Sequence, residues 1–186
     1  AYVRQNVHAF LVAPPPLMQY MEDYETRVKF LKSLIETRAR QISGLANNID
    51  LEFSSKDKGS NGNQKHSVVG GKIATSTPSF TWNENSNATI SRFFEDLIRF
   101  VYFDPDLGGP GVKYSEKWLA AENPLPIVEV NQEMMVGFVE PNAELTMPVK
   151  AWLCAMQPQS TGASESSMTK GGTLESPDVN ITFNAS

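Results

Sequence analysis

The chain has 186 residues, 40% of them hydrophobic and 20% charged, which suits one globular domain with a sizeable core. No apolar run approaches the ~20 residues that span a membrane, and a single cysteine excludes an intramolecular disulfide. The formal net charge of −5 argues against a general nucleic-acid binder, because such binding depends on neutralising phosphates.

The first part of the chain predicts a strand followed by a helix. Val7–Val12 is a short apolar run that Pro14–Pro16 brings to an end, as expected of a buried strand. We predict a helix from Leu17 to about Leu31, because apolar residues recur there at helical spacing and acidic residues precede basic ones. From Ser33 to Leu45 the pattern becomes strand-like.

A very polar segment, Ser54–Lys65, separates two apolar runs at Ile49–Phe53 and Ser67–Ile73. Its Asn61-Gly62 pair suits a tight turn. We predict a long β-hairpin in which the 54–65 loop protrudes from the domain, although the composition allows plain disorder about equally.

The clearest element is an amphipathic helix at about Ala88–Phe103. Six apolar residues follow an i, i+3, i+4, i+7, i+8, i+11 series, and polar residues fill the opposite side. Asn87 or Thr89 can cap the start of this helix.

The apolar arc of this helix is unusually wide. Phe100 and Tyr102 extend it to roughly 200°, which is broad for a helix that lies on a single sheet. The width indicates burial from a second direction, either by the Gly108–Lys117 loop or by another subunit.

The remaining strands and loops indicate a mainly β fold with one or two helices. Strands are predicted at Thr75–Trp82, Pro126–Glu140, Glu144–Met156 and Val179–Phe183, with a flexible Ser/Thr/Gly loop at Gln157–Gly172. We therefore expect residues 1–186 to form a single domain, an antiparallel β-sandwich or small barrel flanked by the amphipathic helix. The segment at about 17–31 is a helical insertion in it.

Charge is distributed unevenly along the chain. Residues 1–73 carry ten Lys/Arg and seven Asp/Glu, whereas residues 74–186 carry six and fourteen. Opposite charge in the two parts favours head-to-tail contact between subunits, unless both charges are simply solvated.

We expect no catalytic, cofactor-binding or metal-ligating residues. Cys154 lies in an apolar run and suits a small buried hydrophobe, and His8 and His66 are far apart in the sequence. Asp104-Pro105-Asp106 could offer oxygen ligands to calcium, but such a trio is more often a turn with solvated carboxylates. The sequence therefore favours an interaction or structural protein over an enzyme.

Two further features bear on function. No run of basic residues accompanies the three tryptophans, as would be expected if they stacked on nucleic acid bases. We therefore expect Trp82, Trp118 and Trp152 to pack in the core. The first residues lack the apolar core of a signal peptide, so we expect a chain that is made and kept in a cytoplasm.

The order of these elements resembles the tube proteins of contractile phage tails, which share a fold with the ring-forming haemolysin-coregulated (Hcp) proteins of type VI secretion. The resemblance rests on fold patterns over about half of the chain. The segments that carry it are Asn6–Val12, Glu36–Leu45, Ser79–Glu84 and Ser91–Ile98. It implies a structural virion protein, assembled in the host cytoplasm, whose hexameric rings close by pairing sheets edge to edge.

The resemblance also implies partners and contact residues. Stacked rings would form the inner tail tube and conduct DNA during ejection without binding it specifically, with a sheath outside and baseplate proteins at one end. Phe100 and Tyr102 are the expected inter-subunit face of the helix. The expected contacts to the next ring are Lys56, Asp57, Lys58, Asn61, Asn63 and Lys65.

Two alternatives remain open at this point. One is a baseplate or tube-initiator protein of the same fold, present as one ring per particle. The other is a carbohydrate- or ligand-binding β-sandwich that uses exposed Trp118 or Tyr114.

Overall fold

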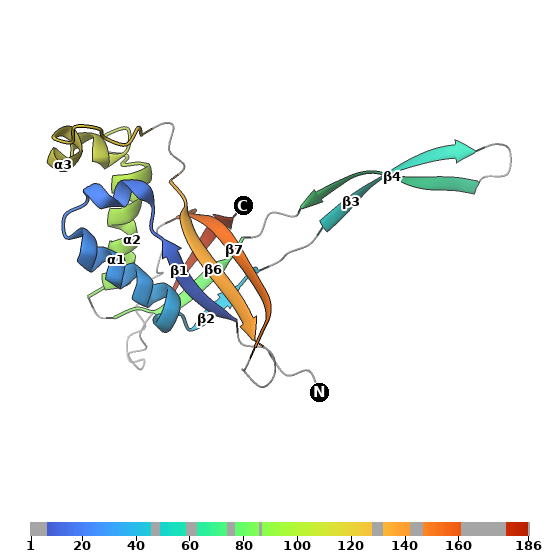
Figure 1. Cartoon of the computed structure of the whole chain (residues 1–186), viewed down its shortest axis with the longest axis horizontal. Helices are drawn as coiled ribbons and strands as arrows, with labels where there is room; N and C mark the ends of the chain where they lie inside the picture. The colour runs from blue at the N-terminus through green and yellow to red at the C-terminus, as the bar shows by residue number, and fades with distance from the viewer. Residues whose placement is uncertain are drawn as a thin grey trace, which may run out of the picture.

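The computed structural model describes residues 7–45, 49–58, 63–73, 77–85, 87–127, 132–141, 147–160 and 178–185. Six strands form one antiparallel sheet in the order β1-β6-β7-β8-β5-β2, and β3 pairs with β4 as a separate ribbon (Figure 1). The strands are β1 His8–Ala13, β2 Gln41–Ser43, β3 Ile49–Lys58, β4 Asn63–Ile73, β5 Ser79–Asn83, β6 Met134–Pro141, β7 Pro148–Pro158 and β8 Asp178–Ala185.

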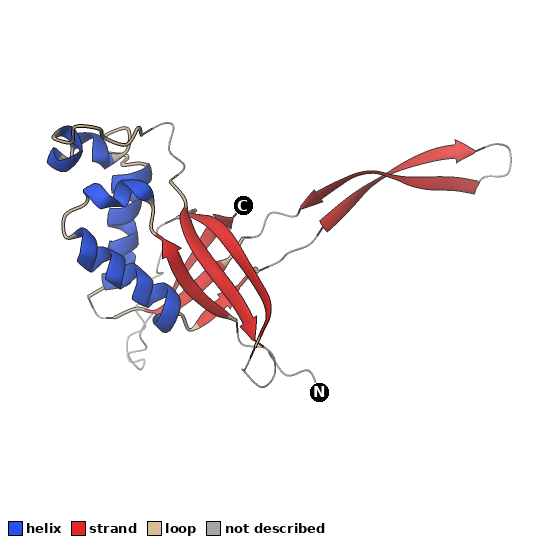
Figure 2. Ribbon diagram, viewed as in Figure 1, coloured by secondary structure: helices blue, strands red, loops and turns tan. Residues whose placement is uncertain are grey.

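The helices gather on one side of this sheet (Figure 2). They are η1 Pro16–Tyr20, α1 Tyr24–Ser33, η2 Leu34–Arg38, α2 Thr89–Leu97, η3 Ile98–Tyr102, η4 Gly111–Tyr114 and α3 Glu116–Leu119. None of the helices in the described ranges is long and apolar enough to cross a membrane. The mainly β fold with a flanking amphipathic helix is thus confirmed.

The core lies between the sheet and the helices, and aromatic side chains dominate it. Along β8, every second residue from Val179 to Ala185 is buried, as expected of a strand with one face on the core. Trp82 of β5 is fully buried, with its ring centroid 5.3 Å from that of Phe94 on α2. Its indole N–H donates a 2.8 Å hydrogen bond to the carbonyl of Leu34. Core packing of Trp82 is therefore confirmed.

The segment predicted as one helix and one strand is organised differently. The 17–31 helix is split, because Pro16 starts a short 3-10 turn and Asp23 adopts a left-handed conformation (φ 52°) before α1 begins. The strand expected over Ser33–Leu45 is wrong except at β2. Leu31, Leu34 and Ile35 are buried at helical spacing, so burial against the sheet continues the helix through η2.

The cap of the amphipathic helix also differs from the prediction. The buried carboxylate of Glu84 accepts hydrogen bonds from the backbone N–H groups of Ile90 and Ser91, at 3.1 and 2.8 Å, and from the Ser91 hydroxyl. The side chain of Asn85 accepts from the N–H of Thr89 at 3.1 Å. Neither Asn87 nor Thr89 is the cap, because α2 begins after Ala88, which has a left-handed backbone (φ 51°).

Glu84→Gln is expected to lower the free energy of unfolding at neutral pH by about 1–3 kcal/mol, because a charged acceptor at buried N–H groups is lost. Burial alone raises the pKa of Glu84, but the hydrogen bonds from Ser91, Ile90 and Asn85 bring the net pKa below its usual value. This stabilisation is present above the ordinary glutamate pKa and is lost as pH falls through the folded-state value. Urea denaturation at neutral pH and at about pH 3 measures it.

Exposed Glu25 on α1 provides the matched control, since Glu25→Gln removes the same charge without removing a buried acceptor. The stability difference between the Glu84 variant and the unchanged protein should shrink at the acidic pH. A difference that stays constant across this range would contradict the role assigned to the ionised carboxylate.

Candidate assembly surfaces

The ribbon of β3 and β4 projects away from the six-stranded sheet, at the opposite end of the long axis from the helices (Figure 1). Its strands pair from Ile49 with Ile73 out to Lys58 with Asn63. Residues predicted as the 54–65 loop therefore belong largely to strands. An isolated two-stranded ribbon is marginally stable by itself, so a ribbon of this length calls for a packing partner.

The residues predicted to contact the next ring lie at the outer end of this ribbon. Lys56, Asp57 and Lys58 are on β3, Asn63 and Lys65 are on β4, and Asn61 lies outside the described residues. Lys56 and Lys65 are register partners, as are Asp57 and Gln64. The role of the predicted residues as ring contacts stays a prediction.

The edges of the six-stranded sheet offer less room for pairing. The backbone N–H of Leu11 in edge strand β1 donates a 3.2 Å hydrogen bond to the carboxylate of Glu36 in η2. A carboxylate from the same chain thus satisfies one backbone donor of β1, which leaves this edge strand less able to pair with another chain. The other edge, β2, is only three residues long. Among the described strands that pair with one partner only, β3 and β4, with ten and eleven residues, are longer than β1 with six and β2 with three.

An apolar row crosses the solvent-facing side of β1, β6 and β7. Phe10 pairs with Gly137, which pairs with Leu153, so the three residues share one face of the sheet. A Cβ at Gly137 would lie 2.3 Å from Cζ of Phe10, so only glycine lets the ring lie over the backbone. Phe10, Val12 and Leu153 are 41%, 54% and 53% exposed. Exposed apolar residues that lie together on one face of a sheet are typical of interaction surfaces.

The two residues expected at an inter-subunit helix face are both partly covered by the chain itself. Tyr102 is half-buried, and its hydroxyl donates a 2.6 Å hydrogen bond to the carbonyl of Gln132. Its burial, and then the negative charge of Glu133, raise the pKa of the phenol. Phe100 is half-buried, and a Cβ at Gly111 would lie 3.4 Å from its Cα. The chain's own Gly108–Lys117 loop therefore covers part of the arc, and contact with a neighbouring subunit stays a prediction.

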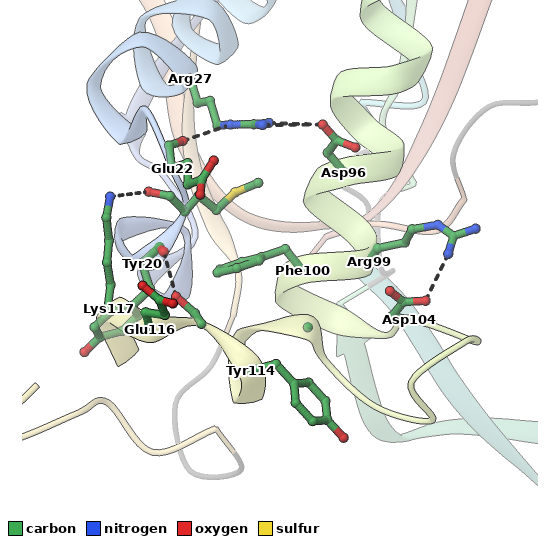
Figure 3. Close-up of a pocket in the computed structure, with 13 residues that line it drawn as sticks. Tyr20, Glu22, Arg27, Asp96, Arg99, Phe100, Asp104, Tyr114, Glu116 and Lys117 are labelled. Atoms are coloured by element: carbon green, nitrogen blue, oxygen red, sulfur yellow. Dashed lines mark hydrogen bonds and ion pairs between the residues drawn. The ribbon is translucent and has the colours of Figure 1, made fainter. Parts of the chain in front are cut away.

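A cavity of about 640 Å³ opens between η1, the α2–η3 helix and the η4–α3 segment (Figure 3). We call it the helix pocket. Tyr20, Phe100 and Tyr114 give it aromatic walls, and charged side chains surround them. The lining residues are Tyr20, Met21, Glu22, Arg27, Asp96, Arg99, Phe100, Asp104, Gly111, Tyr114, Ser115, Glu116 and Lys117.

Arg99 organises one wall of the helix pocket. Its guanidinium forms ion pairs with Glu95, Asp104 and Asp106, at 3.1, 2.9 and 2.7 Å. The hydrogen bond to Asp106, together with the nearby carboxylates, raises the pKa of Arg99. The carboxylates of the Asp104-Pro105-Asp106 turn, weighed as calcium ligands, thus bind an arginine. The described ranges contain no group of three or more His, Cys, Asp or Glu arranged for a metal.

The aromatic residues considered for ligand binding differ in exposure. Trp118 is half-buried, and its indole N–H donates to the carbonyl of Leu125 at 3.0 Å. It is therefore not the exposed platform that the carbohydrate-binding alternative required. Tyr114 is exposed and lies at the rim of the helix pocket (Figure 3).

Three of these features could not be found by reading local patterns. Glu84 lies outside the usual capping spacing, and Glu36 reaches an edge strand 25 residues away. The helix pocket joins segments from Tyr20 to Lys117. Arg99 is different, because Glu95 four residues before it and the acidic turn shortly after it were visible signals.

Comparisons with known proteins identify the family to which the chain belongs. The chain matches the family model for a phage tail tube protein over residues 1–186. Among solved structures, it is similar to a chain of the PVC sheath-tube complex of an extracellular contractile injection system in the extended state, determined by cryo-EM. That similarity has a TM-score of 0.48 and 12% sequence identity, and covers 100% of this chain and 88% of that chain. No curated protein matches the chain. The match over its whole length shows that the chain belongs to the phage tail tube protein family.

Proposed function

We propose that this chain is the repeating subunit of the inner tube of a phage tail, with hexameric rings that stack into a hollow conduit. The match to the tail tube family over the full chain carries the proposal. The role is structural and needs no catalytic group. DNA would pass through the lumen during ejection, a sheath would surround the tube, and a baseplate would close one end after assembly in the host cytoplasm.

The surfaces of the subunit support a repeating assembly. The ribbon of β3 and β4 lies at one end of the molecule and the helices lie at the other. Contacts between unlike surfaces of identical chains do not close on themselves unless the rotation between them allows it, and otherwise they generate filaments. The acidic excess of residues 74–186 suits a conduit, because negative charge facing the lumen would repel DNA and let it slide.

Negative-stain electron microscopy of the purified protein tests the proposal. Stacked hollow rings are the expected image, and averaged end views should have sixfold symmetry. Counting subunits per virion separates the repeating subunit from a baseplate or initiator protein, which would be present as one ring. A protein that remains strictly monomeric at high concentration would contradict the proposal.

A further inference from the structure

We propose that a groove between α1 and α2 binds the acidic turn, residues 104–109, of a second copy of this chain. The inference rests on the proposed function, because a repeating tube supplies the second copy. It adds which two surfaces of neighbouring subunits meet. We call the receiving surface the arginine groove, and its lining residues are Thr26, Arg27, Phe30, Asn87, Thr89, Arg92, Phe93 and Asp96.

The arginine groove has an aromatic lining where the two helices meet. The rings of Phe30 on α1 and Phe93 on α2 pack edge to face, with their centroids 5.0 Å apart. The groove encloses about 360 Å³, which is at the lower end of the range for ligand pockets. It therefore has room for a few side chains, and the aromatic lining favours apolar ones.

The charge of the arginine groove favours an acidic partner. Two arginines and one carboxylate line it, and Arg27 contacts that carboxylate, Asp96, at 3.4 Å. Arg92 is exposed and forms no ion pair with any residue of the described ranges. Its planar guanidinium can therefore bind a carboxylate from outside the chain. The Arg38 guanidinium, 5.5 Å from the centre of the Phe30 ring, adds a third positive charge nearby.

The acidic turn presents a carboxylate beside apolar side chains. The Asp106 side chain is 80% exposed, and Leu107 and Phe103 are 46% and 54% exposed. Arg99 contacts only Oδ2 of Asp106, at 2.7 Å, so this carboxylate can accept from a second guanidinium. Three carboxylates surround Arg99, and counting the Lys113 ammonium beside the turn still leaves an excess of one negative charge. The turn and the groove thus have opposite charge.

Hydrogen bonds hold the acidic turn in one shape. Asp104 and Gly109 exchange backbone hydrogen bonds of 2.9 and 3.3 Å, and the N–H of Leu107 donates to the carbonyl of Asp104 at 3.2 Å. The Asp104 carboxylate accepts from the N–H of Asp106 at 3.0 Å. Gly108 has a φ of 66°, which glycine adopts without strain. Because the turn is already ordered, it loses little conformational entropy on docking.

The groove and the turn lie toward opposite ends of the helix that α2 and η3 form together. Phe103 follows Phe93 by ten positions, a distance of roughly 15 Å along the helix axis at ~1.5 Å per residue. Figure 3 shows Asp96 and Asp104 separated along this helix. A chain therefore cannot place its own turn in its own groove. The contact joins unlike surfaces of identical chains, which gives a ring if the rotation closes and a filament if it does not.

Charge reversal tests the inference. Arg92→Asp and Asp106→Lys should each raise the protein concentration needed for assembly by about tenfold or more, because like charges then meet at every contact. Sedimentation velocity measures the assembled fraction, and electron microscopy identifies rings and tubes. Both side chains are exposed, so the fold should persist, and urea denaturation checks this. The matched controls, Lys29→Asp and Glu122→Lys, change exposed charges outside both surfaces and should assemble normally.

A compensating variant separates lost attraction from misfolding. Arg92→Asp/Asp106→Lys reverses both surfaces in one chain and should recover assembly. An equimolar mixture of the two single variants should also assemble, because alternating chains pair opposite charges at every contact. Unchanged assembly of Arg92→Asp would overturn the inference, and so would a folded double variant that assembles no better than the single variants. If the unchanged protein forms no rings or tubes, the proposed function itself has failed.

Cross-linking provides a measurement that does not depend on charge. Thr26→Cys/Leu107→Cys, in a chain whose buried Cys154 is replaced by alanine, should give a ladder of disulfide-linked multimers when the assembled protein is oxidised. Each single cysteine variant serves as a control and should give no ladder. An assembled double variant that gives no ladder would place the acidic turn elsewhere and overturn the inference.

Discussion

Trp82→Ala is expected to lower the free energy of unfolding by about 3–5 kcal/mol. Trp82 is fully buried and stacks on Phe80 at a centroid distance of 5.6 Å. It also contacts Phe94 and donates its indole N–H to Leu34, so one side chain joins β5 to α2 and η2. Removing it leaves a cavity where three elements meet, which cannot collapse without moving one of them. Urea denaturation of the unassembled protein measures the loss.

Trp82→Phe divides the expected effect into its parts. It keeps an aromatic ring in the core but removes the indole N–H, so the Leu34 carbonyl loses its donor. We expect about 1–3 kcal/mol from an unsatisfied buried acceptor and the smaller ring. The half-buried Trp152 is the comparison, since Trp152→Ala should cost less. A loss below about 1 kcal/mol for Trp82→Ala would show that the helices are not held on the sheet through this residue.

Strongly periodic segments could be predicted from the sequence. Ile90, Phe93 and Phe94 follow the helical period, and all three are buried in α2. Alternation along β8 predicted which residues face the core. In both segments the spacing of the apolar residues along the sequence matches the face that is buried, so local sequence preference and tertiary packing favour the same structure.

The segment from Ser33 to Leu45 shows where such reading fails. Leu34 and Ile35 fit a short strand as well as the end of a helix. The choice depends on tertiary contact, because both side chains are buried and the Leu34 carbonyl receives the Trp82 indole N–H. A residue 48 positions away thus takes part in fixing the local structure.

The assembly surfaces were only partly predictable for the same reason. Polarity and the Asn61-Gly62 pair indicated a hairpin, since turn chemistry is local. The helix pocket needed the positions of η1, η3 and α3 relative to one another, which no short sequence window contains.

Removing the β3–β4 ribbon is expected to abolish tube formation and leave the sheet folded. Ile49 and Ile73 are register partners, so an Asn-Gly turn can join them in place of residues 50–72. The six-stranded sheet contains neither β3 nor β4, so the free energy of unfolding should change by less than about 1 kcal/mol. Circular dichroism and urea denaturation check the fold, and electron microscopy should show no tubes.

A graded variant locates the part of the ribbon that matters. Ser54 and Ser67 are also register partners, so joining them removes only the outer half, which carries Lys56, Lys58 and Lys65. Loss of tubes in both variants would assign stacking to the outer half. Tubes in the graded variant alone would assign it to the inner half. Tubes of normal length in both would show that the rings stack through the body of the subunit, and would leave the projecting ribbon without an assembly role.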